Sequence, residues 1–213
     1  MKNIVILGSG GFAREVAWLL EENNKIKQEW NILGFISSDT NDSLLSYPIV
    51  GDDDWLLAYK DEIYAVCAVG DPKIRAKIVE KYKNKHNVFF PAIISHYARI
   101  SEKVKLGRGC IICAGCILTV DITIGDFCIC NLNCTLGHDD KIGNFVTISP
   151  GSNISGCVEI GDFSDIGTGT AIIPNANIGS NVIIGAGSVV IKNIPSDSTA
   201  VGVPAKVIKK QDV

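Results

Sequence analysis

Residues 106–143 read LGRGCIICAGCILTVDITIGDFCICNLNCTLGHDDKIG, and in this stretch an aliphatic residue returns at almost every sixth position. The same rhythm holds over 97 residues, and 16 of its 17 positions are Ile, Leu or Val. The positions are Ile94, Ile100, Leu106, Ile112, Leu118, Ile124, Cys130, Leu136, Ile142, Ile148, Ile154, Ile160, Ile166, Ile172, Ile178, Ile184 and Val190. A period of six fits neither the 3.6-residue repeat of a helix nor the simple alternation of a strand.

Two further rhythms accompany the first. A mostly small residue stands two positions before the aliphatic one, as at Cys110, Ser152 and Ser164, and a Gly follows the aliphatic residue every eighteen positions from Gly107 to Gly179. Because side chains alternate along a strand, the paired positions point to one side, and a bend must follow each pair. Three such units make a triangular coil, and a sandwich of short strands would not keep this register. The pattern predicts a parallel β-helix of roughly five coils, a prism on the order of 25 Å tall.

Length and charge restrict the function. The chain has 213 residues, 46% of them hydrophobic and 20% charged, with a net charge of −3. This balance does not favour a nucleic-acid partner or an anionic membrane. The apolar run at residues 4–7 is too short for a signal peptide or a membrane span, so we expect a cytoplasmic protein.

The eight cysteines admit two interpretations. Cys110, Cys113 and Cys116 have the spacing of a metal or cluster motif. However, Cys110 and Cys128 are eighteen apart, as are Cys116 and Cys134, and all four fall on the small inward rhythm. We therefore expect them to stack inside the prism as small hydrophobic residues, with Cys130 in an aliphatic position. Disulfides are not expected in a cytoplasmic chain.

The N-terminal part begins like a nucleotide-binding unit. A strand expected at residues 3–8 leads into Gly8-Ser9-Gly10-Gly11-Phe12-Ala13 and a helix expected over 12–22. This G-x-G-x-x-A pattern places backbone amides at a helix N-terminus, where they suit phosphate oxygens. The next strand, expected at 32–37, ends in Ser37-Ser38 and lacks the acid that holds the ribose of NAD.

The following segments complete half of a doubly wound fold. We expect a loop up to residues 50–54, whose acidic run caps a helix starting near Trp55, and a strand over 64–69. A helix begins near Pro72 and extends to about residue 83, and a short strand over 87–90 leads into the prism. Arg75, in the first turn of that helix, is expected either to meet a phosphate or to lie on a solvated face.

One of the three histidines is a candidate base. His86 lies in a Lys-rich stretch and is expected at the surface, and His96 is a candidate turn residue at the mouth of the first coil. His138 stands between the inward positions 136 and 142, so its side chain should point outward at a bend, next to Asp139. An imidazole with a pKa near about 6.5 suits proton removal from an attacking amine or hydroxyl, and a carboxylate would fix its tautomer.

Taken together, these features resemble a known family. The repeat [LIV]-G-x-x-[small]-x is similar to the hexapeptide repeat of the left-handed β-helix acyltransferases. A small Rossmann-like domain ahead of such a prism resembles the NeuD-type sugar acetyltransferases, which include N-acetyltransferases of nucleotide-linked 4-amino sugars and sialic-acid O-acetyltransferases. The likeness covers essentially the whole chain. It implies an α/β nucleotide-sugar-binding domain over 1–90 and a left-handed β-helix with a C-terminal tail over 91–213 that uses acetyl-CoA and no metal.

The resemblance also implies residue roles. His138 matches the catalytic base, Asp139 the acid that follows it, and Asn131 a residue bordering the same site. The expected coenzyme A contacts are Thr147, Gly156, Thr168, Ala186 and Lys206, and the expected substrate contacts are Gly8, Ser9, Gly10, Gly11, Ser37 and Ser38. Phe12 stands where some members have His, and Ser37-Ser38 where some have two Asp, so the nucleotide stays open. The family implies a homotrimer with sites shared between neighbouring prisms.

Four classes of function compete for this sequence, the first with two variants. The leading one is acetylation of the 4-amino group of a nucleotide-linked deoxy sugar for surface glycan synthesis, and its near alternative is O-acetylation of a sugar such as sialic acid, because His138 could serve either. An NAD-dependent dehydrogenase is opposed by the missing ribose acid. A γ-type carbonic anhydrase would need three His ligands, and only His96 and His138 lie in the prism. A non-catalytic scaffold would need neither His138-Asp139 nor the first domain.

Overall fold

The computed structural model describes residues 1–39 and 46–210. Its first part is a five-stranded parallel sheet with the strand order β3-β2-β1-β4-β5. The strands are β1 (Lys2–Leu7), β2 (Trp30–Ile36), β3 (Ile49–Gly51), β4 (Ile63–Cys67) and β5 (Val88–Phe89), and the helices are α1 (Gly11–Ile26), α2 (Asp53–Ala58) and α3 (Pro72–Glu80). The predicted half of a doubly wound fold is confirmed. No helix in the described ranges is long and apolar enough to cross a membrane.

Local sequence accounts for the helix starts. The side chain of Asp52 accepts a hydrogen bond from the Trp55 N–H at 3.1 Å, and that of Asp71 accepts one from the Ile74 N–H at 2.8 Å. Both residues are N-caps. The cap in the acidic run was predicted, whereas Asp71 was not singled out as a cap. The structure differs from the expectation at several elements: Ile49–Gly51 forms an edge strand where we expected loop, α1 runs on to Ile26, and α3 ends at Glu80 instead of near residue 83. Part of the expected loop, residues 40–45, lies outside the described residues.

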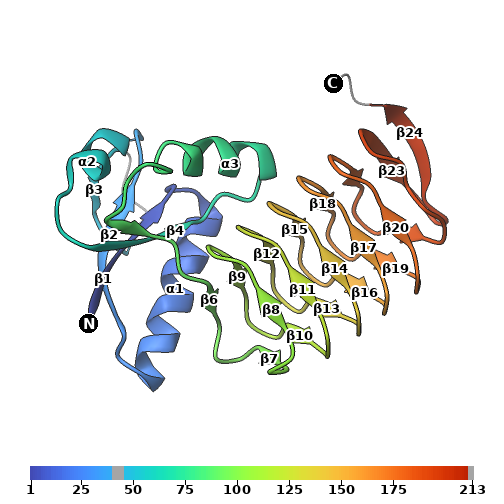
Figure 1. Cartoon of the computed structure of the whole chain (residues 1–213), viewed down its shortest axis with the longest axis horizontal. Coiled ribbons are helices and arrows are strands. Elements are labelled where there is room, and N and C mark those ends of the chain that lie inside the picture. The colour runs from blue at the N-terminus through green and yellow to red at the C-terminus, as the bar shows by residue number, and fades with distance from the viewer. Residues whose placement is uncertain (40–45, 211–213) are drawn as a thin grey trace.

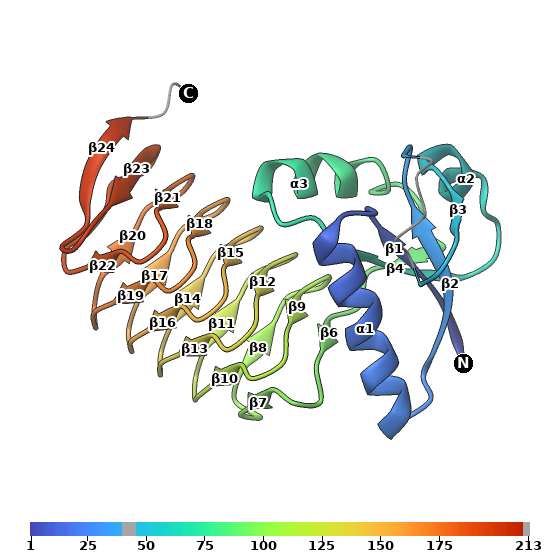
Figure 2. The same cartoon turned by 180° about the vertical axis from the view of Figure 1, so that it is seen from behind.

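The second part is a prism of two-residue strands (Figures 1 and 2). Its strands are β6 (Ile93–Ile94), β7 (Arg99–Ile100), β8 (Lys105–Leu106), β9 (Ile111–Ile112), β10 (Ile117–Leu118), β11 (Thr123–Ile124), β12 (Ile129–Cys130), β13 (Thr135–Leu136), β14 (Lys141–Ile142), β15 (Thr147–Ile148), β16 (Asn153–Ile154), β17 (Glu159–Ile160), β18 (Asp165–Ile166), β19 (Ala171–Ile172), β20 (Asn177–Ile178), β21 (Ile183–Ile184) and β22 (Val189–Val190). A hairpin of β23 (Ser198–Val201) and β24 (Lys206–Lys210) closes the far end. The predicted left-handed parallel β-helix is thus the fold of this part.

Three sheets form the three faces of the prism. They run β6-β9-β12-β15-β18-β21-β23-β24, β7-β10-β13-β16-β19-β22 and β8-β11-β14-β17-β20, and we call them the eight-, six- and five-stranded faces. Partners along a face are eighteen residues apart, as at Ile129↔Thr147 and Leu118↔Leu136. The aliphatic rhythm fills the interior, where Cys110, Cys128 and Cys130 are also buried. The prediction that these cysteines are core residues is confirmed.

Each edge of the prism is a stack of identical turns with different side chains. One residue per turn has positive φ, the left-handed region that costs non-glycine residues about 1–2 kcal/mol. Between the five- and eight-stranded faces that residue is Gly109, Phe127, Phe145, Phe163 or Asn181, and we call this the aromatic edge after its three Phe residues. Between the six- and five-stranded faces lies the histidine edge, whose residues of positive φ are Asp121, Asp139, Cys157 and Asn175. Between the eight- and six-stranded faces lies the glycine edge, whose residues of positive φ are Gly115, Asn133, Gly151, Gly169 and Gly187.

The N-terminal sheet packs on the eight-stranded face. Helix α1 lies between the sheet and the prism, and its buried residues share a core with Ile93, Ile111 and Ile129. Helices α2 and α3 cover the opposite face of the sheet, and Val79 and Tyr82, in and just after α3, share a second core with Phe127. The outward positions of the eight-stranded face are therefore buried near β6 and exposed by β21, where Ile183 is 43% exposed.

Arg75 joins the two parts of the molecule. Its guanidinium donates to the carbonyl oxygens of Val69 and Gly70, to those of Phe127 and Phe145, and to the Thr147 hydroxyl, at 2.7–3.0 Å. The side chain is fully buried. Our expectation that Arg75 meets a phosphate or a solvated face is wrong, because the helix turns it toward the prism, where five acceptors replace its water.

Candidate active site

His138 and Asp139 form a hydrogen-bonded pair on the histidine edge. The Nδ1 atom of His138 lies 2.8 Å from Oδ2 of Asp139, and both side chains are about 60% exposed, at 61% and 60%. Because a carboxylate only accepts hydrogen bonds, Nδ1 carries the proton of the neutral ring and Nε2 is left as the acceptor. Asp139 adopts φ +65°, a backbone conformation that Asp tolerates better than most other non-glycine residues.

The neighbouring coils hold the pair in place. The Asp139 N–H donates to the Val120 carbonyl at 3.1 Å, and the His138 carbonyl accepts from the Cys157 N–H at 2.8 Å. The imidazole lies directly over Gly156, where an added Cβ would come within 2.6 Å of Nε2 and 2.7 Å of Cε1. The absence of a Cβ at Gly156 therefore lets the imidazole ring approach the backbone. The Gly156 N–H is a hydrogen-bond donor without an acceptor among the described residues.

Asp140 is an acid inside the prism, directly behind His138. Its side chain is fully buried, Oδ1 accepts from the Val158 N–H at 2.8 Å, and Oδ2 has no partner among the described residues. Burial raises the pKa of this carboxyl to about 7. Asp140 was not among the predicted site residues, although it interrupts the small and aliphatic inward rhythm at a position where its equivalents are Ile122 and Val158.

The Gly-rich loop of the N-terminal sheet is exposed to solvent at Gly10 and Gly11. Gly8 has φ +105°, a conformation that favours Gly, and its backbone lies against Val69. Gly10 caps α1 without a side-chain hydrogen bond, and the space beside Gly10 is empty to 4 Å. The hydroxyls of Ser9 and Ser37 are 2.9 Å apart, so the structure brings the loop and the end of β2 together. Free N–H groups at a helix start bind phosphate well.

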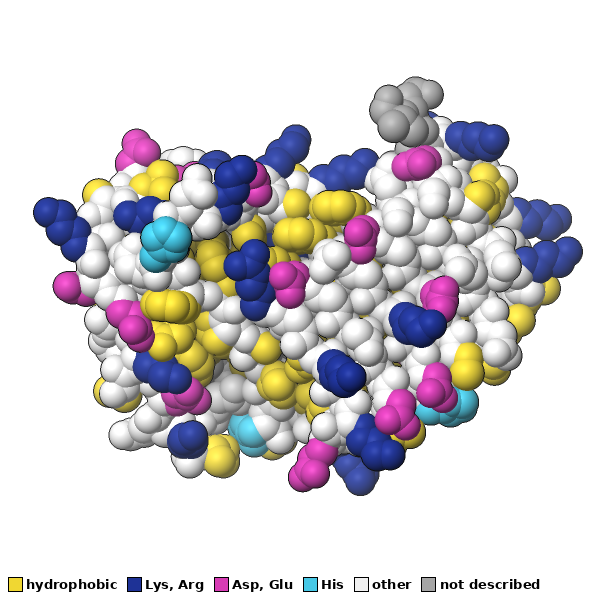
Figure 3. All heavy atoms as spheres, in the orientation of Figure 1, with side chains coloured by type: hydrophobic (Ala, Val, Ile, Leu, Met, Phe, Trp, Pro, Cys, Tyr) yellow, Lys and Arg dark blue, Asp and Glu magenta, His cyan; other side chains and the backbone are white. Residues whose placement is uncertain are grey.

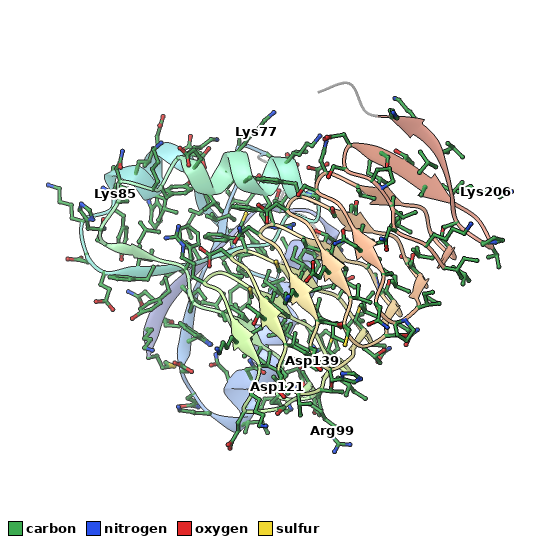
Figure 4. The ribbon with its side chains drawn as sticks, turned by 45° about the vertical axis from the view of Figure 1, so that its right-hand side comes forward. Lys77, Lys85, Arg99, Asp121, Asp139 and Lys206 are labelled. Carbon is green, nitrogen blue, oxygen red and sulfur yellow. The ribbon has the colours of Figure 1, made fainter. Side chains whose placement is uncertain are left out.

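The other expected residues lie elsewhere on the prism. Asn131, Thr168 and Ala186 follow strands of the eight-stranded face and lie along the glycine edge, where Thr168 and Ala186 are exposed. Thr147 is buried at the junction, where its hydroxyl donates to the Gly70 carbonyl at 2.6 Å and accepts from Arg75. Lys206 is exposed on β24 at the far end of the prism (Figure 4).

Within one chain, the Gly-rich loop and His138 lie on opposite sides of the prism. The N-terminal sheet covers the eight-stranded face, whereas the histidine edge joins the other two faces. Figure 4 shows Asp139 and Asp121 low on the prism, away from Lys77 on α3. The residues expected to bind the nucleotide therefore do not meet the expected base in the same chain.

One of the larger hollows lies at neither of these places. A cavity of about 610 Å³ lies between α3 and the aromatic edge, lined by Phe145, Phe163, Lys77, Arg108 and Asp162 among others. Hydrophobic side chains gather in this region between the N-terminal part and the prism (Figure 3). The three Phe rings of the aromatic edge stack with centroids 5.3 Å apart.

Known proteins share both parts of this architecture. Residues 3–82 match the family model described as the PglD N-terminal domain. The comparison with curated protein sequences gave no match. Among solved structures, PerB from Caulobacter crescentus in complex with CoA and GDP-perosamine is 30% identical, with 98% of each chain covered and a TM-score of 0.87. The acetyltransferase domain of PglB from Neisseria gonorrhoeae is 28% identical, with 98% of this chain and 100% of that chain covered and a TM-score of 0.90.

A third similar structure is WeeI from Acinetobacter baumannii, which is 29% identical over 98% of this chain and 100% of that chain, with a TM-score of 0.84. The fold and these similar structures define an acyltransferase of the hexapeptide-repeat superfamily. Within it, the chain belongs to the NeuD-type sugar acetyltransferases. It is an acetyl-CoA-dependent enzyme that transfers an acetyl group to a sugar.

Proposed function

We propose that the protein N-acetylates the 4-amino group of a nucleotide-linked amino-deoxy sugar, with His138 as the general base, for surface glycan synthesis in the cytoplasm. The observation that carries the proposal is the His138–Asp139 pair, an exposed imidazole with Nδ1 held by a carboxylate and Nε2 lying over Gly156. Perosamine N-acetyltransferase from Caulobacter crescentus has been solved with CoA and GDP-perosamine after replacement of a histidine by Asn or by Ala.

The geometry suits direct transfer without an acyl-enzyme. The free amine attacks the thioester carbonyl, and Nε2 of His138 takes the proton that the nitrogen loses. Asp139 stabilises the imidazolium that forms. The Gly156 N–H is the available donor for the carbonyl oxygen as it becomes an oxyanion. When the carbon–sulfur bond breaks, the imidazolium returns its proton to the sulfur of coenzyme A, so the base is regenerated.

The substrates are placed by resemblance and by the open surfaces. The sugar nucleotide would bind with its phosphates at Gly8, Ser9, Gly10 and Gly11 and its nucleoside toward Ser37 and Ser38. Acetyl-CoA would lie along Gly156, Thr168, Ala186 and Lys206, with Asn131 bordering the reacting groups. Thr147, the remaining predicted coenzyme A contact, has both hydrogen bonds of its hydroxyl committed at the junction with Arg75 and Gly70.

A homotrimer would complete the site. In one chain the loop and His138 are on opposite sides of the prism, so a neighbour must supply one of them. The six-stranded face, which separates the histidine and glycine edges, exposes Ile117 and carries Ala171 and Val189 outward. The five-stranded face instead presents the exposed ion pair between Lys141 and Glu159. Packing through the less charged face would bring the histidine edge of one chain to the glycine edge of the next.

The function is tested by thiol release from acetyl-CoA against a panel of acceptors. The panel contains UDP-, dTDP- and GDP-linked 4-amino-4,6-dideoxy sugars together with free and CMP-linked sialic acid. We expect turnover on one 4-amino sugar nucleotide, with an N-acetyl product by mass spectrometry. Turnover on sialic acid alone would replace the proposal with the O-acetyltransferase alternative, which uses the same base on a hydroxyl.

A further inference from the structure

A third side chain with a metal-binding atom lies beside His138 and Asp139. Cys157 is the next residue of the histidine edge, eighteen positions after Asp139, so the two occupy the same turn position on adjacent coils, about 4.8 Å apart along the prism. Both adopt positive φ, at +65° and +61°. The Cys157 Sγ lies 3.9 Å from His138 Nδ1, and the ligand atoms of all three residues lie within 4.8 Å of one another.

Cys157 differs from every other cysteine of the chain. All eight are free, and the other seven are buried, whereas Cys157 is exposed. Burial raises the pKa of Cys113 to about 12, which keeps that thiol protonated. Cys157 is therefore the thiol that solvent, ions and reagents can reach.

The geometry and chemistry of this cluster match a soft divalent ion. Zn²⁺ bonds to thiolate sulfur at about 2.3 Å and to imidazole nitrogen and carboxylate oxygen at about 2.0–2.2 Å, so its ligands lie roughly 3–4 Å apart. His138 Nδ1 lies 2.8 Å from Asp139 Oδ2 and 3.9 Å from Cys157 Sγ, so small side-chain rotations would bring these atoms to the ligand spacing of a bound Zn²⁺. Sulfur and nitrogen ligands exclude Mg²⁺ and Ca²⁺, which prefer oxygen. A water would complete the tetrahedron.

We propose that His138, Asp139 and Cys157 form an inhibitory site for Zn²⁺ or a similar thiophilic ion. The inhibition rests on the proposed function of His138. Binding releases the thiol proton of Cys157 and places the metal on Nδ1, so the one proton of the neutral imidazole moves to Nε2. A metal-bound ring that carries its proton on Nε2 cannot accept another there. The ion also takes Asp139 away from its role of orienting the base.

Binding is measured with Cd²⁺, which reports directly on sulfur through its thiolate charge-transfer absorption. Titration of the full chain should produce one such band that saturates at one ion per chain. Cys157→Ser should abolish the band, and Asp139→Asn should weaken Cd²⁺ binding about 10-fold or more. His96→Asn, which removes an exposed imidazole outside the cluster, is the matched control and should leave the band unchanged. A missing band, or an equal band in Cys157→Ser, overturns the site.

Inhibition is measured separately with Zn²⁺ during acetyl transfer. Wild-type turnover should fall at low Zn²⁺ and return after addition of EDTA, while Cys157→Ser should keep its turnover without metal and need at least about 10-fold more Zn²⁺ for the same loss. Equal sensitivity of the two proteins overturns the inhibitory role. The two hypotheses fail differently: a fully active His138→Asn protein would refute the base, whereas the Cd²⁺ band tests the metal site without any turnover.

Discussion

The aromatic edge and the histidine edge have the same backbone turn and different surroundings. On both, successive turns are eighteen residues apart and one residue per turn has φ near +60°. On the aromatic edge Phe127, Phe145 and Phe163 stack with interplanar angles of 9° and 2°, and α3 packs against their start. On the histidine edge the equivalent residues are Asp139 and Cys157, exposed and beside an imidazole.

The difference shows what the repeated turn does and does not determine. The coil sets the position and spacing of side chains, and the choice of side chain then decides whether an edge binds another part of the protein or carries chemistry. A substitution on the histidine edge should therefore affect turnover with little effect on stability. A substitution at the junction beside the aromatic edge should do the reverse.

The largest effect is expected from His138→Asn. If His138 is the base as proposed, its removal should lower kcat about 10²- to 10⁴-fold, because the attacking nitrogen then loses its proton to water. The ring is 61% exposed, so the free energy of unfolding should stay within about 0.5 kcal/mol of wild type. Thiol release and urea unfolding measure the two quantities.

His86→Asn is the control, because this histidine is exposed near the end of the N-terminal part and lies outside the site. It should change neither quantity. A His138→Asn protein that unfolds much more easily would contradict the separation between the two edges.

Arg75→Met is the corresponding change at the aromatic edge. It should destabilise the protein by about 3–5 kcal/mol, because the Phe127 and Phe145 carbonyls and the Thr147 hydroxyl lose a buried charged donor. Lys77→Met, on the exposed side of the same helix, is the matched control and should be close to neutral. Unfolding in urea, followed by circular dichroism, measures both. An Arg75→Met protein as stable as the control would show that the junction does not depend on this side chain.

Gly156→Ala should have an intermediate effect, confined to the histidine edge. The added Cβ would lie 2.6 Å from Nε2 of His138, so the ring must move, and we expect kcat to fall about 10- to 100-fold. A double-mutant cycle provides the control. Adding Gly156→Ala to the His138→Asn protein should lower kcat little further, because the imidazole that the added Cβ would displace is absent from that protein. Additive losses would mean that Gly156 acts independently of the ring.

The effect expected from Asp140→Asn depends on pH. The pKa of Asp140 is raised to about 7 by burial, whereas an unfolded Asp titrates near about 3.9. Between these values the folded protein keeps a proton that the unfolded chain releases, so wild-type stability falls as the pH rises toward 7. The limiting slope is about 1.4 kcal/mol per pH unit. Asn keeps the acceptor for the Val158 N–H and should remove this slope, so the variant gains stability relative to wild type at pH 8.

The comparison for this variant is Asp121→Asn, an exposed position on the same edge. That protein should retain the wild-type pH dependence when urea unfolding is followed from pH 4.5 to 8. A wild-type stability that rises over this range would contradict the burial of an uncharged Asp140.

The fold could be predicted from sequence because its signal is repeated. Every turn of the prism repeats the same pattern of side chains, so the period of six, the Gly rhythm and the inward cysteines all predict one architecture. The outward position of His138 followed from the same rule. The N-cap predicted in the acidic run was a local signal, and it is confirmed at Asp52.

Contacts between distant segments could not be predicted this way. Arg75 looks like a solvated helix residue, and only the fold shows that Phe127 and Phe145, more than fifty positions later, accept its hydrogen bonds. The proximity of Cys157 to His138 could have been predicted, because Cys157 is eighteen residues after Asp139. That spacing was used only for the residues that point into the prism. The same spacing also links the three Phe residues of the aromatic edge.

The opposite placement of the Gly-rich loop and His138 has a genetic consequence. If neighbouring chains share each site as proposed, two inactive alleles can rescue each other. A cell that makes one copy with His138→Asn and another with a disrupted Gly8–Gly11 loop would assemble mixed trimers. In these, about a quarter of the sites would combine an intact loop with an intact histidine. A chain with a damaged loop and a chain with a damaged His138 would then complement each other, as expected for an active site that is shared between two polypeptides.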